Sequence, residues 1–555
     1  MRRLLVFTLL VVALAATGYR RGEAPAPPFR MSGETLSGET IVAKSLSRPA
    51  AAAIAELPRE FLDTTPPRST GRVLFVPAEG RVESALNAFR RALRLPAGGR
   101  LQAALDRARP GDVVELQAGA TFVGNFILRS KWEGGWIIVR SSAHERLPPA
   151  GSRVSPAHTA LMPRLVTPNA RPAIRTAPGA RGVRLVGIEI APAPGVFVHS
   201  LVELGALEES PAALPADIVV DRCYLYADPA AGGRRGVALN GMRLAVIDSH
   251  LSGFKEVGAD SQAIMGWNGP GPFKIVNNYL EGAGENVMFG GDDPRIAGLV
   301  PGDIEIRGNN FSKPLAWRQH DPSYAGTPWT VKNLLELKNA RRVLVEGNVF
   351  ERNWAQTQHG LAIVFTPRNQ HGRAPWSTVE DVTFRRNIIR KSTGGFFILG
   401  WDNLRSSRQL RRVLIQGNLF VDIGAFTETA LPDEGVLFLI SDGPTDVVID
   451  SNTAFHEGAP IRATDQIAGR WPARGFVFSN NLLVRPGGPA GDGSGADGDP
   501  GTSLGAYFPG APFTGNVLAR GRSAADLVRG GAAAPPAGAD LAAISAAVAQ
   551  WRHAP

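Results

Sequence analysis

The sequence predicts an all-β solenoid, in which short strands coil around one apolar core. A short motif that ends at a polar corner recurs along the chain, as VLVEGN at Asn348, VTFRRN at Asn387 and VLIQGN at Asn418. Within the motif, apolar and polar residues alternate with a period of two, which is typical of strands and not of amphipathic helices. No helical pattern recurs from unit to unit, which argues against helical and leucine-rich repeats.

The corner residue of the motif recurs at a regular interval. Its positions are Cys223, His250, Asn278, Asn310, Asn348, Asn387, Asn418, Asn452, Asn481 and Asn516. Neighbouring positions lie 27 to 39 residues apart, which is typical of a solenoid with variable insertions. Asn suits a corner because it tolerates left-handed backbone angles, and stacked Asn amides can hydrogen-bond to one another. We therefore interpret these Asn residues as structural corners and not as ligands.

One complete unit, or rung, is predicted from Leu334 to Arg368. It contains three short apolar runs, with tight corners at Asn339 and at Gly347–Asn348, and the next rung begins at Leu361. The rung is therefore expected to contribute three strands, one to each side of the coil.

The N-terminal end predicts export. Residues 1–18 combine Met1-Arg2-Arg3 with an apolar run and small residues, which is the pattern of a secretory signal peptide. After its removal we expect no transmembrane anchor and a secreted or periplasmic protein. Residues 19–95 are predicted to be a linker and N-terminal extension, with a strand at 72–76 and a helix at Val82–Leu95.

The solenoid itself is predicted over residues 96–520. It begins with LQAALDRARPGDVVEL, in which Leu101, Ala104, Leu105 and Ala108 form one helical face and Pro110–Gly111 ends the helix. A helix here would cover the open strand edges at the end of the coil. Residues 521–555 are predicted to be an Ala/Gly/Pro-rich tail with a short helix.

From Leu101 to Asn516 the chain resembles the right-handed parallel β-helix superfamily, which has the pectate-lyase-like fold. The resemblance rests on the initial helix, the first strands after it and the repeated corners. It implies a right-handed parallel β-helix with an N-terminal capping helix.

Charge and cysteine content restrict the partners. The single cysteine, Cys223, excludes an internal disulfide and cysteine metal sites, and its place at a corner favours a packing role. The net charge of +10 favours anionic partners, but no nucleic-acid-binding motif accompanies it. We expect an acidic polysaccharide as partner, no nucleic acid, and a monomer.

Charged residues are predicted along one outer face of the coil. Because alternate side chains of a strand point to opposite sides, Glu336 and Lys338 point outward if Leu335 and Leu337 point inward. By the same count Asn286, Asp292, Asp293, Arg368 and Asp402 fall on or near this face. The alternative interpretation is an ordinary solvated face.

Long loops and tryptophans lie close to these rungs. The loops Ser312–Lys332, Glu351–Gly360 and Pro367–Val379 flank them, and long loops on a rigid scaffold often bind ligands. Six of the ten tryptophans lie between residues 267 and 401. We predict that Trp267, Trp329 and Trp376, with Asp402, bind substrate; local packing of the tryptophans is the alternative.

The order of Lys338 and Arg368 is similar to that in the alginate lyase and chondroitinase B-like family. The resemblance implies a uronate lyase, in which Lys338 removes the C5 proton of the sugar and Arg368 assists the departing oxygen. It also implies a calcium ion held by Glu336, Asp292 and Asp293, since calcium prefers carboxylate oxygens. No other cofactor is expected.

Two further functions remain open. Gly291-Asp292-Asp293 and Gln358-His359-Gly360 resemble motifs of galacturonan hydrolases with this fold, which use two carboxylates and a His-Gly pair. A non-catalytic carbohydrate-binding or cell-surface protein is the other alternative, because one fold serves many functions.

Overall fold

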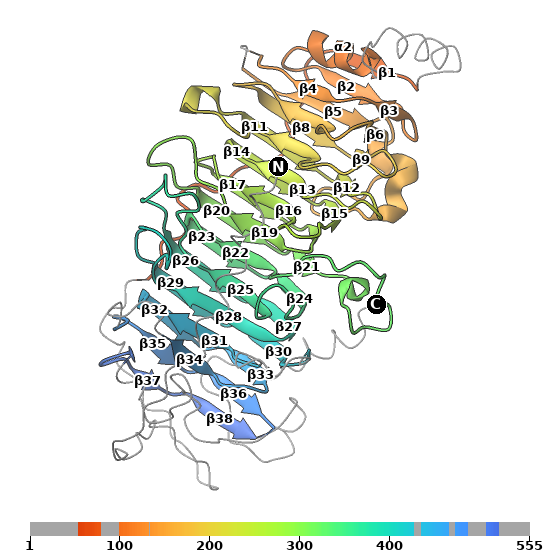
Figure 1. The fold of residues 1–555 in the computed structure, drawn as a ribbon. Helices are drawn as coiled ribbons and strands as arrows, with labels where there is room; N and C mark the ends of the chain where they lie inside the picture. Colours follow the sequence, from red (N-terminus) through yellow and green to blue (C-terminus); the bar gives the residue numbers. More distant parts are fainter. Residues whose placement is uncertain are drawn as a thin grey trace, which may run out of the picture.

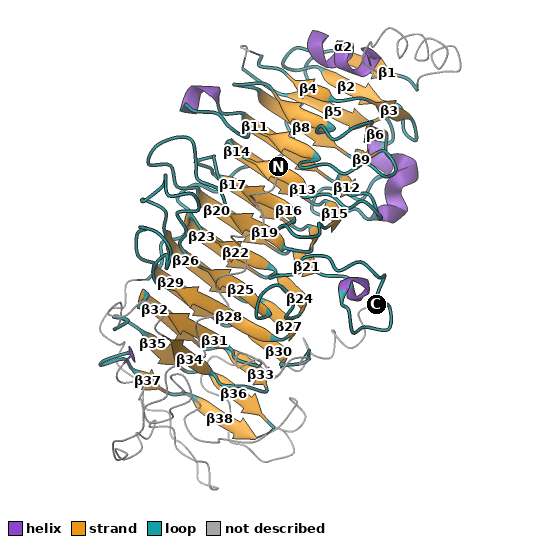
Figure 2. Cartoon of the chain, viewed as in Figure 1, coloured by secondary structure: helices purple, strands orange, loops and turns teal. Residues whose placement is uncertain are grey.

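Short strands follow one another around a coil, and each complete rung adds one strand to each of three parallel sheets (Figure 1). The computed structural model describes residues 54–78, 99–131, 134–426, 435–464, 472–486 and 507–520. Every strand pair in the three sheets is parallel, and strands dominate over helices (Figure 2). The chain is thus a right-handed parallel β-helix, as predicted.

The three sheets differ in length. Sheet A has 14 strands: β1 (Val73–Val76), β2 (Val113–Leu116), β5 (Ile137–Ser141), β8 (Arg181–Val186), β11 (Ala216–Asp221), β14 (Met242–Ile247), β17 (Phe273–Val276), β20 (Gly302–Arg307), β23 (Ala340–Glu346), β26 (Val379–Arg385), β29 (Arg411–Gln416), β32 (Thr445–Asp450), β35 (Val477–Ser479) and β37 (Phe513–Thr514). Sheet B has 13: β3 (Thr121–Val123), β6 (Arg164–Thr167), β9 (Glu189–Pro192), β12 (Tyr224–Tyr226), β15 (His250–Phe254), β18 (Tyr279–Gly282), β21 (Asn310–Ser312), β24 (Val349–Asn353), β27 (Ile388–Ser392), β30 (Leu419–Ile423), β33 (Thr453–His456), β36 (Leu482–Arg485) and β38 (Val517–Arg520). Sheet C has 11: β4 (Phe126–Leu128), β7 (Ile174–Thr176), β10 (Val202–Leu204), β13 (Arg235–Leu239), β16 (Gln262–Gly266), β19 (Glu285–Phe289), β22 (Leu335–Leu337), β25 (Leu361–Phe365), β28 (Gly394–Leu399), β31 (Phe438–Ser441) and β34 (Ile461–Thr464).

The core is one continuous apolar column inside the coil. Because successive side chains of a strand point to opposite sides, Leu335 and Leu337 point inward. There they join a buried cluster that extends from Val76 to Phe508. Within it the rings of Phe311, Phe350 and Phe384 stack from rung to rung, with centroids 4.3 and 5.6 Å apart. Burying a phenylalanine side chain stabilises a fold by roughly 2–3 kcal/mol, so each rung contributes strongly to the next.

A buried amide ladder fills the corner between sheets A and B. In each step the Oδ1 of one Asn accepts hydrogen bonds from the backbone N–H and the Nδ2 of the Asn one rung earlier. The ladder comprises Asn278, Asn309, Asn348, Asn387, Asn418, Asn452, Asn481 and Asn516. The predicted corners are thus confirmed as structural.

Two predicted corner positions are wrong by one residue. Asn309, and not Asn310, belongs to the ladder, and Ser249, and not His250, precedes Asn278 in it. The residue before each ladder position adopts a left-handed backbone, as Gly308 (φ 62°) and Asp248 (φ 53°) do, which turns the chain from sheet A into sheet B. Asn310 and His250 instead begin strands β21 and β15.

A helix lies at the N-terminal end of the coil. Helix α2 (Gly99–Arg107) packs against β1 and β4, with Leu101 and Ala104 almost completely buried and Ala108 buried just beyond its end. The predicted helix and its apolar face are confirmed; its role as a cap stays a prediction. Four short 3-10 helices lie in loops of the described residues: η1 (His144–Arg146), η2 (Pro156–Leu161), η3 (Pro211–Ala213) and η4 (Leu315–Trp317).

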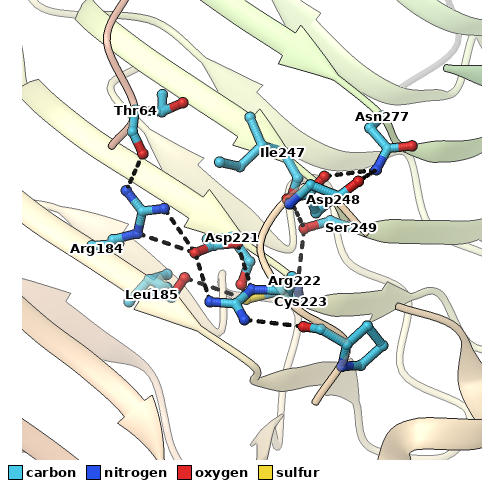
Figure 3. Close-up of polar contacts among 12 residues, drawn as sticks. Thr64, Arg184, Leu185, Asp221, Arg222, Cys223, Ile247, Asp248, Ser249 and Asn277 are labelled. Atoms are coloured by element: carbon cyan, nitrogen blue, oxygen red, sulfur yellow. Dashed lines mark hydrogen bonds and ion pairs between the residues drawn. The ribbon is translucent and has the colours of Figure 1, made fainter. Parts of the chain in front are cut away.

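We call residues 54–72 the N-terminal strap. They run along the outside of sheet A toward β1, opposite to the direction in which successive rungs are added. Their hydrogen-bond partners follow the sheet in reverse order, from Asp381 in β26 through Asp303 in β20 and Lys274 in β17 to Arg184 in β8. Figure 3 shows Arg184 donating to the Thr64 carbonyl while it also pairs with the buried Asp221. The predicted strand at 72–76 is β1, which pairs with β2.

Several predicted segments lie outside the described residues. They are the signal peptide at 1–18, the helix at Val82–Leu95 and the tail at 521–555. Among the residues that the structure describes, no helix has the length and apolar character needed to cross a membrane.

Candidate functional site

Long loops flank the outer face of sheet C at both ends of its strands. Because the strands are parallel, the loops that precede them share one edge, the amino edge, and the loops that follow share the carboxyl edge. The amino edge carries residues 313–334 and 354–360, and the carboxyl edge carries residues 290–301, 366–378 and 400–410. These are close to the loops predicted from the sequence.

Glu336, in β22, and Lys338, directly after it, lie on the outer side of sheet C, as predicted, but they are not exposed. Their side chains are only 3% and 11% accessible, and Lys338 Nζ lies 3.4 Å from Glu336 Oε1. Burial acts to raise the pKa of the Glu336 carboxyl, but Lys338 and Lys332 outweigh it and hold this pKa below its ordinary value. The expectation of an exposed Lys338 is therefore wrong, because flanking loops and the ion pair enclose it.

Lys332 extends this pair into a buried network that the sequence analysis did not single out. Its Nζ lies 2.7 Å from Asp260 Oδ2 and 3.0 Å from Glu285 Oε1. Burial acts to lower the pKa of Lys332, but Glu285, Asp260 and Glu336 together raise it well above its ordinary value. The three carboxylates come from three rungs, so only the stacking of rungs brings them together.

Asn286 does not lie on this outer face, contrary to expectation. Its Nδ2 donates to the Leu280 and Ser312 carbonyls, and its Oδ1 accepts from Lys313 Nζ at 3.3 Å. Strand β19 is irregular here, because the backbone N–H groups of Asn286 and Val287 both point to the Leu334 carbonyl. The irregularity shifts the alternation by one residue at the start of the strand.

Lys338 and Arg368 lie side by side at the carboxyl edge of neighbouring rungs. The Arg368 N–H donates to the Lys338 carbonyl at 2.9 Å. The Arg368 guanidinium pairs with Asp402 Oδ1 at 2.9 Å and also donates to Asn403. Asp402 is 2% exposed and accepts the Asn369 N–H, so it holds loop residues in place and is enclosed by them.

Asp292 and Asp293 contact the loop at 366–378 and not Glu336. His371 Nε2 lies 3.2 Å from Asp292 Oδ1, and the buried Asp293 accepts the backbone N–H groups of His371 and Arg373. Within the described residues, no three His, Cys, Asp or Glu side chains form a group that could hold a metal ion. The three predicted calcium ligands do not gather into one site, because each already has protein partners.

Gly290 brings this acidic turn close to Lys338. Its φ of +96° is left-handed, and a Cβ there would lie 2.7 Å from Lys338 Cβ. Only glycine accommodates both the backbone angle and the close approach. The turn that carries Asp292 and Asp293 therefore starts directly beside Lys338.

The tryptophans are mostly packed and not displayed. Trp267 is 6% exposed, against Met265 and Met288, and Trp329 is 5% exposed, in a cluster with Trp317 and Trp354. The rings of Trp267 and Trp329 are therefore packed, as in the alternative interpretation, because strand residues pack against Trp267 and the other two tryptophans pack with Trp329. Trp376 is half-buried, and its Nε1 donates to the Leu299 carbonyl at 2.9 Å.

The hydrolase-like motifs lie at opposite edges of sheet C. His359 precedes β25 and lies at the amino edge, whereas Asp292 follows β19 and lies at the carboxyl edge. The histidine that meets Asp292 is His371, from the loop after β25. Its position three residues after Arg368, in the sequence PRNQHG, was a signal that could have identified it.

Comparisons with known proteins concern the fold. No family model matches the chain, and no curated protein matches it. Among solved structures it is similar to an alginate lyase from Paenibacillus sp. str. FPU-7, at 12% identity and a TM-score of 0.32, over 81% of this chain and 99% of that one. A mannuronic acid specific polysaccharide family 6 lyase from human gut microbiota is 14% identical, with a TM-score of 0.39, over 75% and 86%. The Dettilon tailspike protein is 12% identical, with a TM-score of 0.42, over 76% of this chain and 64% of that one.

Proposed function

We propose that the chain binds an acidic polysaccharide along the outer face of sheet C and cleaves it by β-elimination. The observation that carries the proposal is the placement of Lys338 and Arg368 side by side at one edge, with a 2.9 Å backbone hydrogen bond between their rungs. Long loops at both edges would flank an extended polymer lying on this face. We further propose, from the N-terminal pattern, that the protein is secreted or periplasmic.

Lys338 is the proposed base. Its amine would take the C5 proton of a uronate residue, the C4–O bond would break, and a C4–C5 double bond would form as the departing oxygen takes up a proton. A catalytic base must first be neutral. Lys332 favours this state, because its charge also lowers the pKa of the Glu336 carboxyl and continues to act on that buried carboxylate when Lys338 carries no charge.

Ultraviolet absorbance of the unsaturated product tests this function. The protein would be incubated with alginate, polygalacturonate and chondroitin sulfate, with and without calcium. We expect absorbance to rise with at least one polymer, and Lys338→Ala to lower the rate by about 10²–10⁴-fold, the usual contribution of a general base. Lys131→Ala, which removes a lysine near helix α2, is the control and should retain full activity. Wild-type rates in Lys338→Ala, at an unchanged melting temperature, would exclude Lys338 as the base.

A non-catalytic binding protein is the second candidate. The ion pair with Glu336 and the 11% accessibility of the Lys338 side chain favour it. Retardation of the protein in a gel containing an acidic polysaccharide, without any ultraviolet-absorbing product, would support binding alone.

A further inference from the structure

We propose that residues 367–378 form a preformed recognition loop, whose Arg373 and His371 bind the anionic groups of the polysaccharide. The inference rests on the proposed function in one respect, that the ligand is an acidic polymer. It assigns the contact with the polymer's charge to two residues that the sequence analysis did not select.

Asp293 fixes the exposed tip of the loop from the rung before β22. Its Oδ2 accepts the backbone N–H of His371 at 3.1 Å and of Arg373 at 2.9 Å, and its side chain is 1% exposed. A buried carboxylate that accepts two backbone N–H groups makes charge-assisted bonds, which are stronger than neutral ones. The backbone that carries both side chains is therefore held in one conformation.

The following rung fixes the other part of the loop. Asp402 Oδ2 accepts the Asn369 N–H at 2.9 Å, and Asn369 Oδ1 in turn accepts the Ala374 N–H at 2.8 Å. The Trp376 ring N–H donates to the carbonyl of Leu299, which lies in the loop after β19. Anchors from the following rung and from the loop two rungs earlier leave little of the loop to be ordered when a ligand binds, which favours affinity.

The two arginines of the loop differ in what their guanidinium groups contact. Arg368 is engaged by Asp402 at 2.9 Å. Arg373 is half-exposed, and its nearest carboxylates, on Asp292 and Asp293, lie 3.9 and 3.7 Å away, beyond hydrogen-bond distance. Its planar fork of N–H groups can therefore receive a carboxylate or sulfate in two parallel bonds. Arg373 is therefore the arginine of this loop whose guanidinium can take up an anionic group of the ligand with both arms of its fork.

Asp292 marks the place that the anion would take. This carboxylate is 36% exposed and lies 3.2 Å from the half-exposed His371 and beside Arg373. Ion pairs between exposed side chains contribute little to stability, so an incoming carboxylate can replace this contact at small cost. Asp293 and Asp402 then act as positioning residues that hold the loop, and not as metal or substrate ligands.

Affinity electrophoresis tests the assignment of Arg373. Native gels would contain alginate, polygalacturonate or chondroitin sulfate, with neutral dextran as the polymer control. We expect Arg373→Ala to weaken retardation by about tenfold in the acidic gels, the effect of losing one charge-assisted pair. Arg386→Ala is the matched control. Arg386 is 74% exposed at the corner between sheets A and B, away from the loop, and its loss should leave the retardation unchanged. Equal retardation of Arg373→Ala and the wild type would overturn the inference.

Limited trypsin digestion tests the role of Asp293. Asp293→Ala should speed cleavage after Arg373 and also weaken retardation, whereas Asp292→Ala should leave the cleavage rate unchanged. Asp293→Asn keeps an acceptor oxygen for the two backbone N–H groups and should restore both properties toward wild type. Unchanged cleavage in Asp293→Ala would contradict the positioning role. Retention in the acidic gels without ultraviolet-absorbing product would reject the lyase and leave this inference standing.

Discussion

Two buried histidines predict that acid destabilises this protein. His456, in β33, is 3% exposed, and burial together with Arg485 lowers its pKa to about 4. His250, in β15, is stacked on Tyr279 at 4.4 Å, and burial lowers its pKa to about 4 as well. Both rings are neutral in the folded protein at pH 5–6, where an exposed histidine takes up a proton.

The free energy of unfolding should therefore fall as the pH falls from 6.5 to 4. In this window the unfolded chain binds a proton at His456 and the folded chain does not, so acid favours unfolding. Below pH 4 the folded state is protonated too and this contribution ends. Lowering the His456 pKa from its ordinary value of 6.5 to about 4 corresponds to a loss of about 3 kcal/mol of unfolding free energy across this window. Urea unfolding at pH 7 and pH 4.5 measures it, and His456→Phe should show a smaller difference; an unchanged difference would contradict the assignment.

The amide ladder is the element that fixes the register of the rungs. The Asn309 side chain, inside the ladder, accepts two hydrogen bonds from Asn278 and donates two, to the Ile275 carbonyl and to Asn348, so one side chain links three consecutive rungs. The ladder is buried from Asn278 to Asn481, with Asn309 1% exposed. Loss of one member leaves several buried polar groups without partners, which is costlier than loss of one exposed hydrogen bond.

Asn309→Ala should destabilise the protein by about 3 kcal/mol or more. It removes the acceptor for the Asn278 N–H and Nδ2 and leaves the Ile275 carbonyl without its donor. Asn310→Ala is the matched control, because Asn310 stands outside the ladder at the start of β21 and should have a much smaller effect. Thermal or urea unfolding of both variants shows which of the two residues belongs to the ladder. A larger loss of stability in Asn310→Ala than in Asn309→Ala would show that the assignment of Asn309 is wrong.

The strap links rungs that lie far apart along the coil. In a solenoid each rung contacts only the adjacent rungs. Residues 54–72 bridge β26 to β1 along the outside of sheet A (Figure 1). Leu62 packs there against Val219, Ala245 and Ile247. The strap therefore couples the middle of the coil to its N-terminal end.

Leu62→Asp should release the strap. The change places a charge against the apolar patch on sheet A and should cost about 1–2 kcal/mol of unfolding free energy. Trypsin should then cleave faster after Arg59 and Arg68. Phe61→Asp is the control, because Phe61 is 48% exposed and should leave both stability and cleavage unchanged. Similar behaviour of the two variants would show that Leu62 does not anchor the strap.

The coil itself follows from local patterns in the sequence. Alternation with a period of two determines which residues face the core, and a polar residue after a left-handed position marks each corner, because both depend on near neighbours in the chain. The two register errors arose where two polar residues stand together, as Asn309–Asn310 and Ser249–His250 do. There the local pattern offers two corners, and only the ladder selects one.

The candidate site depends on contacts between distant residues, and these only the tertiary structure decided. The sequence indicated Glu336, Lys338 and Arg368 because each follows the alternation of its own strand. Loop lengths and the stacking of rungs determine that Lys332 meets Glu285 and that Asp293 meets the backbone of His371 and Arg373, which lie 78 and 80 residues further along. The energy of a charged side chain depends on its partners across the coil, and a periodic pattern along one strand carries no information about them.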